Sequence, residues 1–441
     1  MAINTVVVFG DSLSDIGKKW VTKAGYMARK TGQMKVSPSG RFSDCRNWTD
    51  FMYEQATGRT LITDTANSTI KLSNRHTTLN SNSLLQGVTF EDFQYANYAE
   101  GGACGDTPAN LRAFLGTFED QIKAFISDCK NNKITLGNTL FIIWFGANDL
   151  YTAGRDPAGM ATVAEKIASI HRDTLNDFVT QWNNAMRLEK RRREEAVGIF
   201  ELENIRARGE KESNFIFVNL ARPLSSVRYT LQLKKAEQSL LSAAKPMSFE
   251  MASMNPFKSN MWLAESTMRS VEIDNPDNKK IKEYIQLKNV VSHIKSLEQG
   301  VLNFNLALAL HTRKKGDGLV EIGSCMSEET ISKLVAGNYG LRTGADTQEA
   351  LHVSSADYST NNLTAPMTTI DEVHPTDHVY RLIWLEIYEE IKKCGCSFGS
   401  LSNARGAPTL SNLSGPGAQE RVNFARVLQQ IPGARANLKP P

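Results

Sequence analysis

Ser12 occupies a position in the chain where a serine hydroxyl could act as a nucleophile. It follows a β-branched run, residues 5–9, and a glycine, Gly10, that can take the tight turn at the end of a buried parallel strand. We expect Asp11 or Ser12 to cap a helix that begins at Leu13. The backbone N–H of Ser12 would then lie at a helix N-terminus, where α/β sheets bind ligands and stabilise negative charge. Because such turns also serve as plain connections, Ser12 alone is only a candidate.

Asp371 and His374 could activate this serine. They stand three residues apart in Asp371-Glu372-Val373-His374-Pro375, so their side chains can meet across one turn of chain. Serine is a poor nucleophile until a base removes its proton, and imidazole is suited to that task near neutral pH. The carboxylate would hold the imidazole tautomer and stabilise the positive charge that follows proton uptake.

Two further positions could supply hydrogen bonds to an oxyanion. Gly102 offers a backbone N–H without a side chain in the way, with Gly101 as the alternative if that loop is registered one residue earlier. Asn148 offers an amide N–H. Together with the N–H of Ser12 they form a set of three donors for acyl transfer, where the loss of one donor typically costs about 3 kcal/mol of transition-state stabilisation.

These residues need a sheet whose strand ends converge. Apolar or alternating runs predict strands at 5–10, 93–99, 139–145, 215–220 and 319–322, and helical patterns at about 47–57, 114–130 and 158–212 separate several of them. Residues 59–92 are polar and are expected to form surface loops with short strands. Strands that alternate with helices predict an α/β protein whose parallel sheet is covered on both faces.

Composition excludes several other classes of protein. The 441-residue chain is 41% hydrophobic and 22% charged, as expected of an ordinary globular protein, and its net charge of +4 does not indicate nucleic-acid binding. The charged stretch at 187–212 interleaves Glu with Arg, which is typical of a solvated helix. No apolar run approaches the roughly 18 residues of a membrane span. No positively charged leader precedes the first strand, so we expect synthesis in the cytoplasm without a visible signal peptide.

The six cysteines do not form a recognisable disulfide framework. They are scattered, and the pair Cys394 and Cys396 is one residue too close for a C-x-x-C motif. We interpret them as reduced structural residues, with a regulatory disulfide as the alternative.

The second half of the chain extends beyond what a minimal sheet needs. Residues 224–350 are mostly helical in pattern, and their centre at 247–262 is rich in Met and aromatic residues. Such residues at helical spacing usually form a core; the alternative is an adaptable apolar cap that contacts a lipid or a membrane surface. A polar turn and an amphipathic helix follow at 371–393. Residues 399–441 have the composition of a flexible tail with one short helix at 418–431.

Four short motifs occur in order along the chain: Gly10-Asp11-Ser12-Leu13, Asn97-Tyr98-Ala99-Glu100-Gly101-Gly102-Ala103, Gly146-Ala147-Asn148-Asp149 and Asp371-Glu372-Val373-His374-Pro375-Thr376. Together they resemble those of the GDSL lipase/esterase family, also called the SGNH hydrolases. A further segment, Gly40-Arg41-Phe42-Ser43 with Trp48, is similar to one in the branch of bacterial phospholipases and glycerophospholipid–cholesterol acyltransferases, although Asp44 replaces its usual Asn. The resemblance covers roughly 1–225 and 365–395.

The resemblance implies a fold and a site. The fold would be a three-layer α/β/α sandwich with a five-stranded parallel sheet, a flavodoxin-like arrangement, spanning 1–398 and interrupted by a helical insertion at about 224–350. Ser12 would be the nucleophile, His374 the base and Asp371 its orienting acid, while Ser12, Gly102 and Asn148 would form the oxyanion hole. No cofactor is implied, and the residues identify no protein activator.

Three functional hypotheses follow from these residues. The first is a serine esterase for lipids, a phospholipase A or lysophospholipase that could also transfer the acyl group to an alcohol such as a sterol. The second is a carbohydrate O-acyl esterase, and the third is a catalytically idle fold that binds a partner. The resemblance also favours delivery of such a lipid-modifying protein into a host cell.

Several of the polar residues have interpretations other than acyl chemistry. His374 and His378, with Asp371 and Asp377 nearby, could hold a metal, but this combination is common in loops that bind none. Asp15 and Asp149 are expected to brace their turns rather than perform chemistry. The other histidines lack motifs and are expected to be surface or core residues, namely His171, His293, His311 and His352.

Overall fold

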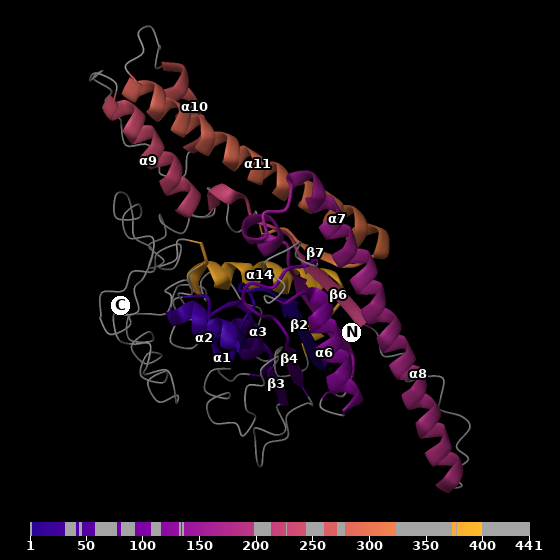
Figure 1. Ribbon diagram of the computed structural model, residues 1–441. Helices are drawn as coiled ribbons and strands as arrows, with labels where there is room; N and C mark the ends of the chain where they lie inside the picture. The colour runs from indigo at the N-terminus through magenta and orange to yellow at the C-terminus, as the bar shows by residue number, and fades with distance from the viewer. Residues whose placement is uncertain are drawn as a thin grey trace.

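The computed structural model shows a β-sheet between two layers of helices, with a group of long helices extending from one side (Figure 1). Because the strands are short apolar runs and the helices between them are amphipathic, each helix can bury one face against the sheet. The structure describes residues 2–30, 41–43, 46–57, 77–80, 93–106, 116–131, 134, 136–197, 213–225, 227–243, 260–270, 278–322, 373–375 and 377–398.

The central sheet has the strand order β3-β4-β2-β5-β6-β7. The five strands β4, β2, β5, β6 and β7 are mutually parallel, as predicted. Strand β3 lies in the 59–92 segment, where short strands were expected, and it adds an antiparallel edge to this sheet, a pairing that was not predicted. In register, Thr5 pairs with Thr139 and Gly10 pairs with Trp144, so β2 and β5 end level. The bounds are β2 Thr5–Gly10, β3 Thr77–Asn80, β4 Gln94–Asn97, β5 Thr139–Trp144, β6 Ser213–Val218 and β7 Gly318–Val320.

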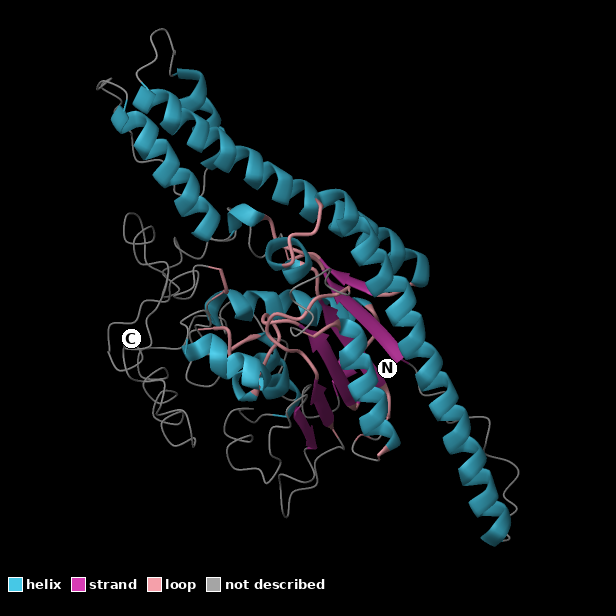
Figure 2. Cartoon of the chain, in the orientation of Figure 1, coloured by secondary structure: helices cyan, strands magenta, loops and turns pink. Residues whose placement is uncertain are grey.

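Alternate residues of the strands face two separate cores. Val6 and Val8 belong to one core, which α3 and α14 cover; Val7 and Phe9 belong to the other, beneath α6, α7 and the start of α8. Figure 2 shows these helices on both sides of the sheet. The three-layer sandwich is therefore confirmed. The helices of these layers are α1 Lys18–Val21, α2 Lys23–Lys30, α3 Trp48–Thr57, α6 Phe118–Lys130, α7 Met160–Glu165, α8 Arg172–Val197 and α14 Asp377–Lys393.

A second sheet, of two strands, pairs the beginning of the chain with the segment that follows α14. Strand β1 (Ala2–Ile3) pairs in parallel with β8 (Ser397–Phe398), which follows α14. Ile3 and Phe398 are both buried in the core beneath α3 and α14. This pairing ties the chain after α14 to its first strand.

Three helices between β6 and β7 form what we call the arm: α9 (Val227–Ala243), α10 (Asn260–Ser270) and α11 (Asn278–Lys315). They extend away from the sheet in Figure 1. The arm has an apolar cluster of its own, built on Leu233, Leu240, Leu287 and Ile294. Met261 packs in this cluster, as the core interpretation predicts. Met247, Met251 and Met254 lie outside the described residues. So do Phe249, Phe257 and the tail from 399.

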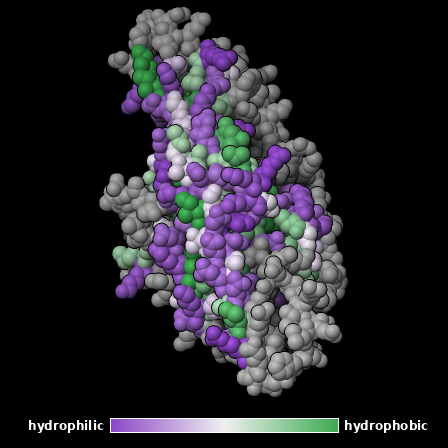
Figure 3. Space-filling model, turned by 90° about the vertical axis from the view of Figure 1, so that its right-hand side faces the viewer, coloured by the Kyte–Doolittle hydropathy of each residue, from purple (hydrophilic) through white to green (hydrophobic). Residues whose placement is uncertain are grey.

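The surface of the helical layers is mainly polar. On the side that faces right in Figure 1, hydrophilic residues cover most of the described surface and hydrophobic ones form separate patches (Figure 3). Within the described residues, no helix combines the length and the apolar character that crossing a bilayer requires. Among the described residues, Cys104, Cys129, Cys394 and Cys396 are not joined in disulfide bonds.

Candidate active site

The turn that follows β2 carries Ser12, but the helix predicted to start at Leu13 does not form there. Residues 11–14 make a tight turn in which Ser14 N–H donates to Asp11 O at 3.1 Å, and α1 begins only at Lys18. Asp15 causes this delay, because its carboxylate accepts the N–H groups of Gly17, Lys18 and Lys19. The negative charge of Asp15, rather than that of Ser12 or Asp11, therefore lies at the start of the helix.

The structure brings Ser12 and His374 together, 362 residues apart in the chain. His374 Nε2 lies 2.7 Å from Ser12 Oγ, a distance at which an imidazole can remove the hydroxyl proton. The ring of Phe42 packs against that of His374, with 4.9 Å between their centroids, and Phe42 O accepts a hydrogen bond from Tyr380 of α14. Asp371, the predicted orienting acid, lies outside the described residues.

Gly102 lies in the loop after β4 and has φ +87°, a backbone conformation that favours glycine. The neighbouring Gly101 N–H already donates to Asp15 Oδ2 at 2.7 Å. Among the described residues, no such bond engages the N–H of Gly102 or of Ser12. Gly102, rather than Gly101, is therefore the position from which this loop can offer a backbone donor.

Asn148 starts η2 (Asn148–Thr152), a π-helical turn after β5, and its amide bridges the other two loops. Its Nδ2 lies 3.1 Å from Ala103 O and 3.3 Å from Asp11 Oδ2, while its Oδ1 accepts from the Thr152 hydroxyl at 3.0 Å. The structure thus places all three predicted donor segments, those of Ser12, Gly102 and Asn148, at the same ends of β2, β4 and β5.

Three buried carboxylates connect these three loops in pairs. Asp15 joins the Ser12 turn to Gly101, and Asp149 joins the Asn148 turn to the other end of that loop by accepting from Gly105 and Asp106 N–H at 2.7 and 3.0 Å. Asp11 faces Asn148. The predicted bracing roles of Asp15 and Asp149 agree with these contacts.

Burial governs the charge of these carboxylates. It raises the pKa of Asp11 to about 7 and that of Asp149 to about 6, although the backbone hydrogen bonds that each carboxylate accepts lower its pKa. Burial likewise raises the pKa of Asp15. Such shifts follow because removing a carboxylate from water disfavours its charged form.

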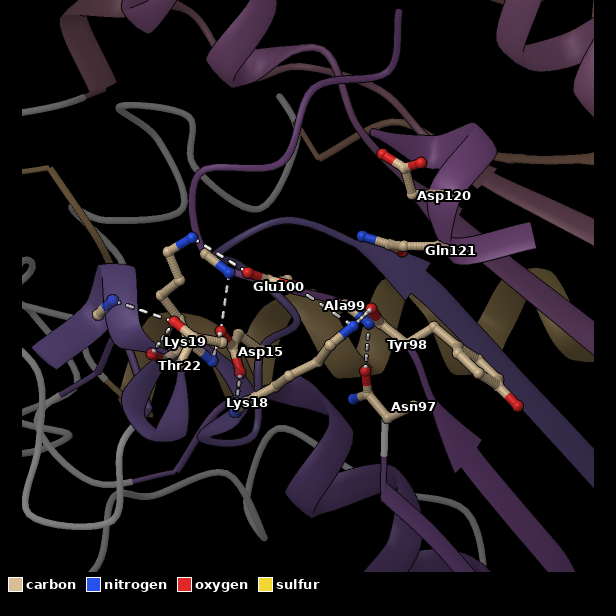
Figure 4. A network of polar contacts seen from close by, with 12 residues as sticks. Asp15, Lys18, Lys19, Thr22, Asn97, Tyr98, Ala99, Glu100, Asp120 and Gln121 are labelled. Atoms are coloured by element: carbon tan, nitrogen blue, oxygen red, sulfur yellow. Dashed lines mark hydrogen bonds and ion pairs between the residues drawn. The ribbon is translucent and has the colours of Figure 1, made fainter. Parts of the chain in front are cut away.

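Two lysines on α1 form a buried network beside the Gly101 loop (Figure 4). Lys18 Nζ donates to Tyr98 O at 2.8 Å and lies 3.6 Å from Glu100, while Lys19 Nζ donates to Glu100 at 3.0 Å. Burial lowers the pKa of Lys18. Sequence reasoning missed this network, because nothing in a Lys-Lys pair on a short helix distinguishes buried lysines from surface ones.

Other polar contacts fix the surroundings of the site. The Gln121 side chain, on α6, binds both backbone polar groups of Gly10: it accepts from the N–H at 3.0 Å and donates to the carbonyl at 2.7 Å. Arg41 pairs with the buried Asp50 at 2.7 Å and donates to Ile16 O at 2.9 Å. These contacts hold the segment around Phe42 next to the Ser12 turn.

The three other histidines that the structure describes make contacts elsewhere in the molecule. His171 packs edge-on against Phe118, His311 bonds to the Ser169 hydroxyl at 3.0 Å, and His293 lies near Tyr229 on the arm. In the part of the chain that the structure describes, no group of three or more His, Cys, Asp or Glu side chains is arranged to hold a metal. Asp44, His352 and the His378 side chain lie outside that part.

Comparison with known proteins adds one finding. The model of a family described as GDSL-like lipase/acylhydrolase matches residues 6–387, a range that includes Ser12, Gly102, Asn148, Asp371 and His374. No curated protein matches the chain.

Proposed function

The chain belongs to the GDSL-like lipase/acylhydrolase family and is an ester hydrolase of the serine type, and from this premise we propose that it cleaves acyl esters of lipids through Ser12. The observation that carries the proposal is the 2.7 Å contact between His374 Nε2 and Ser12 Oγ. We propose a phospholipase A or lysophospholipase activity, with transfer of the acyl group to an alcohol such as a sterol as the variant reaction.

The reaction begins with proton transfer from Ser12. His374 Nε2 accepts the hydroxyl proton while Ser12 Oγ attacks the ester carbonyl carbon, which gives a tetrahedral oxyanion and an imidazolium. The imidazolium returns its proton to the alkoxide that leaves, and the acyl group stays on Ser12. Water, or an alcohol, then attacks the acyl carbon while His374 removes its proton. The bond between the acyl carbon and Ser12 Oγ breaks, and the imidazolium returns the proton to Ser12, which releases the acid or the new ester. Asp371 is proposed to orient the imidazole.

Three N–H donors on three loops are proposed to stabilise the oxyanion. The N–H groups of Ser12 and Gly102 and the Asn148 amide are supported by the carboxylate contacts that join those loops. Donors that are fixed before the reaction stabilise the transition state without reorganisation, so each one is expected to contribute about 10²–10³ in kcat.

Two features support a lipid rather than a sugar substrate. The family that matches is one of lipases and acylhydrolases, and the aromatic ring of Phe42 packs directly beside His374. The Met-rich and aromatic segment at 247–262 is the region that we propose for contact with a lipid surface, on the basis of its composition.

The decisive experiment compares the protein with Ser12→Ala on mixed phospholipid vesicles, with and without cholesterol, by lipid mass spectrometry. We expect free fatty acid, and cholesteryl ester if transfer occurs, from the unchanged protein only. Ser242→Ala, on the exposed face of α9, is the matched control and should behave like the unchanged protein.

A second measurement separates the substrate classes. A fluorophosphonate should label the protein but not Ser12→Ala. Activity on p-nitrophenyl octanoate above that on the acetate supports a lipid substrate, whereas sharp preference for acetate would favour a carbohydrate deacetylase. Equal ester cleavage by Ser12→Ala and the unchanged protein would refute the proposed nucleophile.

A further inference from the structure

Asp11, the residue before Ser12, makes a contact that ester hydrolysis through Ser12, His374 and Asp371 does not use. Its side chain is fully buried. Oδ1 accepts the N–H of Leu13 at 3.0 Å, and Oδ2 lies 3.3 Å from Asn148 Nδ2. One carboxylate oxygen thus holds the turn of the nucleophile, and the other faces a proposed oxyanion donor.

The contacts around Asn148 determine which end of its amide faces the site. The Thr152 hydroxyl can donate or accept a hydrogen bond, so it fits either amide orientation. Ala103 O and the ionised Asp11 carboxylate can only accept, so both require the nitrogen end. If the amide rotated by half a turn, its oxygen would face two acceptors and the oxyanion.

From this arrangement we infer that Asp11 is a positioning residue, which keeps the nitrogen end of the Asn148 amide, rather than its oxygen, toward the oxyanion. The oxyanion would share the hydrogen that makes the longer contact, the one with Asp11 at 3.3 Å, while the other hydrogen stays on Ala103 O. This inference deepens the proposed function and rests on it. Asp11 differs in this respect from Asp15 and Asp149, whose carboxylates accept from backbone N–H groups, those of Gly101, Gly105 and Asp106 on the neighbouring loop among them.

The charge on Asp11 links this contact to pH. Burial raises the pKa of Asp11 to about 7, and the charge of Asp149 raises it further, whereas His374 and the Leu13 N–H act in the opposite direction. Among the described residues, His374 and Asp149 are the charged groups that act on Asp11 from neighbouring loops. Because an ionised carboxylate is the stronger acceptor, the amide is held more firmly above neutral pH than below it.

The test is a double-mutant cycle of Asp11→Asn and Asn148→Ala, measured as kcat and KM for one ester. In Asp11→Asn, an amide that keeps the Leu13 contact turns its NH₂ toward that of Asn148, so kcat should fall about 10- to 100-fold with KM changed by less than about twofold. Because Asp11 acts through Asn148, the double variant should be no more than about twofold worse than Asn148→Ala alone.

The outcomes separate this inference from the proposed function. If the two losses multiply, or if Asp11→Asn retains full kcat, the positioning role is wrong while the esterase stands. If the unchanged protein neither cleaves esters nor reacts with a fluorophosphonate, both are overturned. Asp128→Asn, a buried carboxylate on α6 that accepts from Tyr98 OH at 3.0 Å, is the matched control and should retain kcat.

A second measurement keeps Asp11 in place, so it tests the inference even if the Asp11→Asn variant does not fold. In His374→Ala, where no imidazole titrates in the site, the side-chain ¹⁵NH₂ resonance of Asn148 should shift as Asp11 ionises, with a midpoint at or above about pH 7, because the His374 charge that lowers the pKa of Asp11 has been removed. The resonance is assigned by its loss in His374→Ala/Asn148→Ala. An Asn148 signal that stays constant from about pH 5.5 to 8.5 contradicts the inference.

Discussion

The loops that carry Ser12 and the arm formed by α9, α10 and α11 are stabilised by different kinds of contact. Around Ser12 the contacts are polar, short and made between distant segments, such as Gly101 N–H to Asp15 at 2.7 Å and Gly105 N–H to Asp149 at 2.7 Å. Hydrogen bonds are directional, so they fix atoms to within the tolerance that acyl chemistry needs.

The arm is stabilised mainly by apolar packing. Its cluster is built from aliphatic side chains, with one buried polar pair, Thr267 and Glu237, among the described residues. Apolar packing is not directional, so it can hold helices together without fixing single atoms. The difference teaches that the arm supports the site, while the loops define its geometry.

The two regions meet where α11 packs on the Asn148 turn. Phe304 lies beneath Gly146, which has φ +113° and whose added Cβ would approach the Phe304 ring to 2.7 Å; Gly300 lies against Leu150. Tyr151 of η2 packs against Tyr229 of α9, with 5.8 Å between ring centroids. Changes at this contact should therefore affect both regions, which the following predictions test.

The largest expected effect is that of Phe304→Ala at this junction. The ring is 1% exposed, and its removal should lower the free energy of unfolding by about 3–5 kcal/mol. It should also lower kcat, since the turn of Asn148 loses its support. Urea unfolding and ester kinetics measure the two; a loss of stability with unchanged kcat would show that the arm does not support the site.

Leu240→Ala should weaken the arm alone. Leu240 is fully buried in the arm cluster, so about 2–5 kcal/mol of packing is lost. Hydrogen exchange should rise in α9, α10 and the first half of α11, while fluorophosphonate labelling of Ser12 continues. Equal acceleration of exchange in β2 and β5 would show one cooperative unit and break the distinction between the regions.

Gly101→Ala should damage the site without loosening the arm. A Cβ there would lie 2.4 Å from the Phe42 ring, which packs on His374, and a displaced imidazole should lower kcat/KM about 100-fold. Gly159→Ala is the matched control, since its Cβ would meet nothing closer than the Arg155 side chain at 3.5 Å. It should change kcat/KM by far less than Gly101→Ala does.

The pH dependence of stability should originate in the loops. Asp11 and Asp149 bind protons more tightly in the folded protein, because burial raises their pKa to about 7 and about 6. The folded state therefore holds more protons than the unfolded chain, and stability falls as pH rises through this range. Between about pH 6 and pH 8 we expect a loss on the order of 1–2 kcal/mol in urea unfolding, reduced in Asp11→Asn.

The smallest effect is expected on the outer face of the arm. Leu306 on α11 is 61% exposed, so Leu306→Ser should change the free energy of unfolding by less than about 0.5 kcal/mol and leave kcat unchanged. Differential scanning calorimetry and ester kinetics test this. A large destabilisation would mean that this face is covered in solution.

Much of the fold was predictable because it depends on short stretches of sequence. The run Leu140–Trp144 is apolar throughout and lies in β5, and the pattern after residue 371 predicted α14. The prediction of a helix at Leu13 was wrong, since Asp15 takes up the N–H groups that would begin it. The strand β3 lies among polar residues whose pattern is weak, and it forms by pairing with β4.

The sequence by itself determined the residue types that can do acyl chemistry, their order in the chain, and the strands that carry them, because these depend on local pattern and on side-chain chemistry. Only the tertiary structure decided that Asp15 engages Gly101, that Asp11 faces Asn148, and that Lys18 and Lys19 are buried beside Glu100. Those pairings join segments 80 to 140 residues apart, so they depend on the order of strands in the sheet, which no short stretch of sequence specifies.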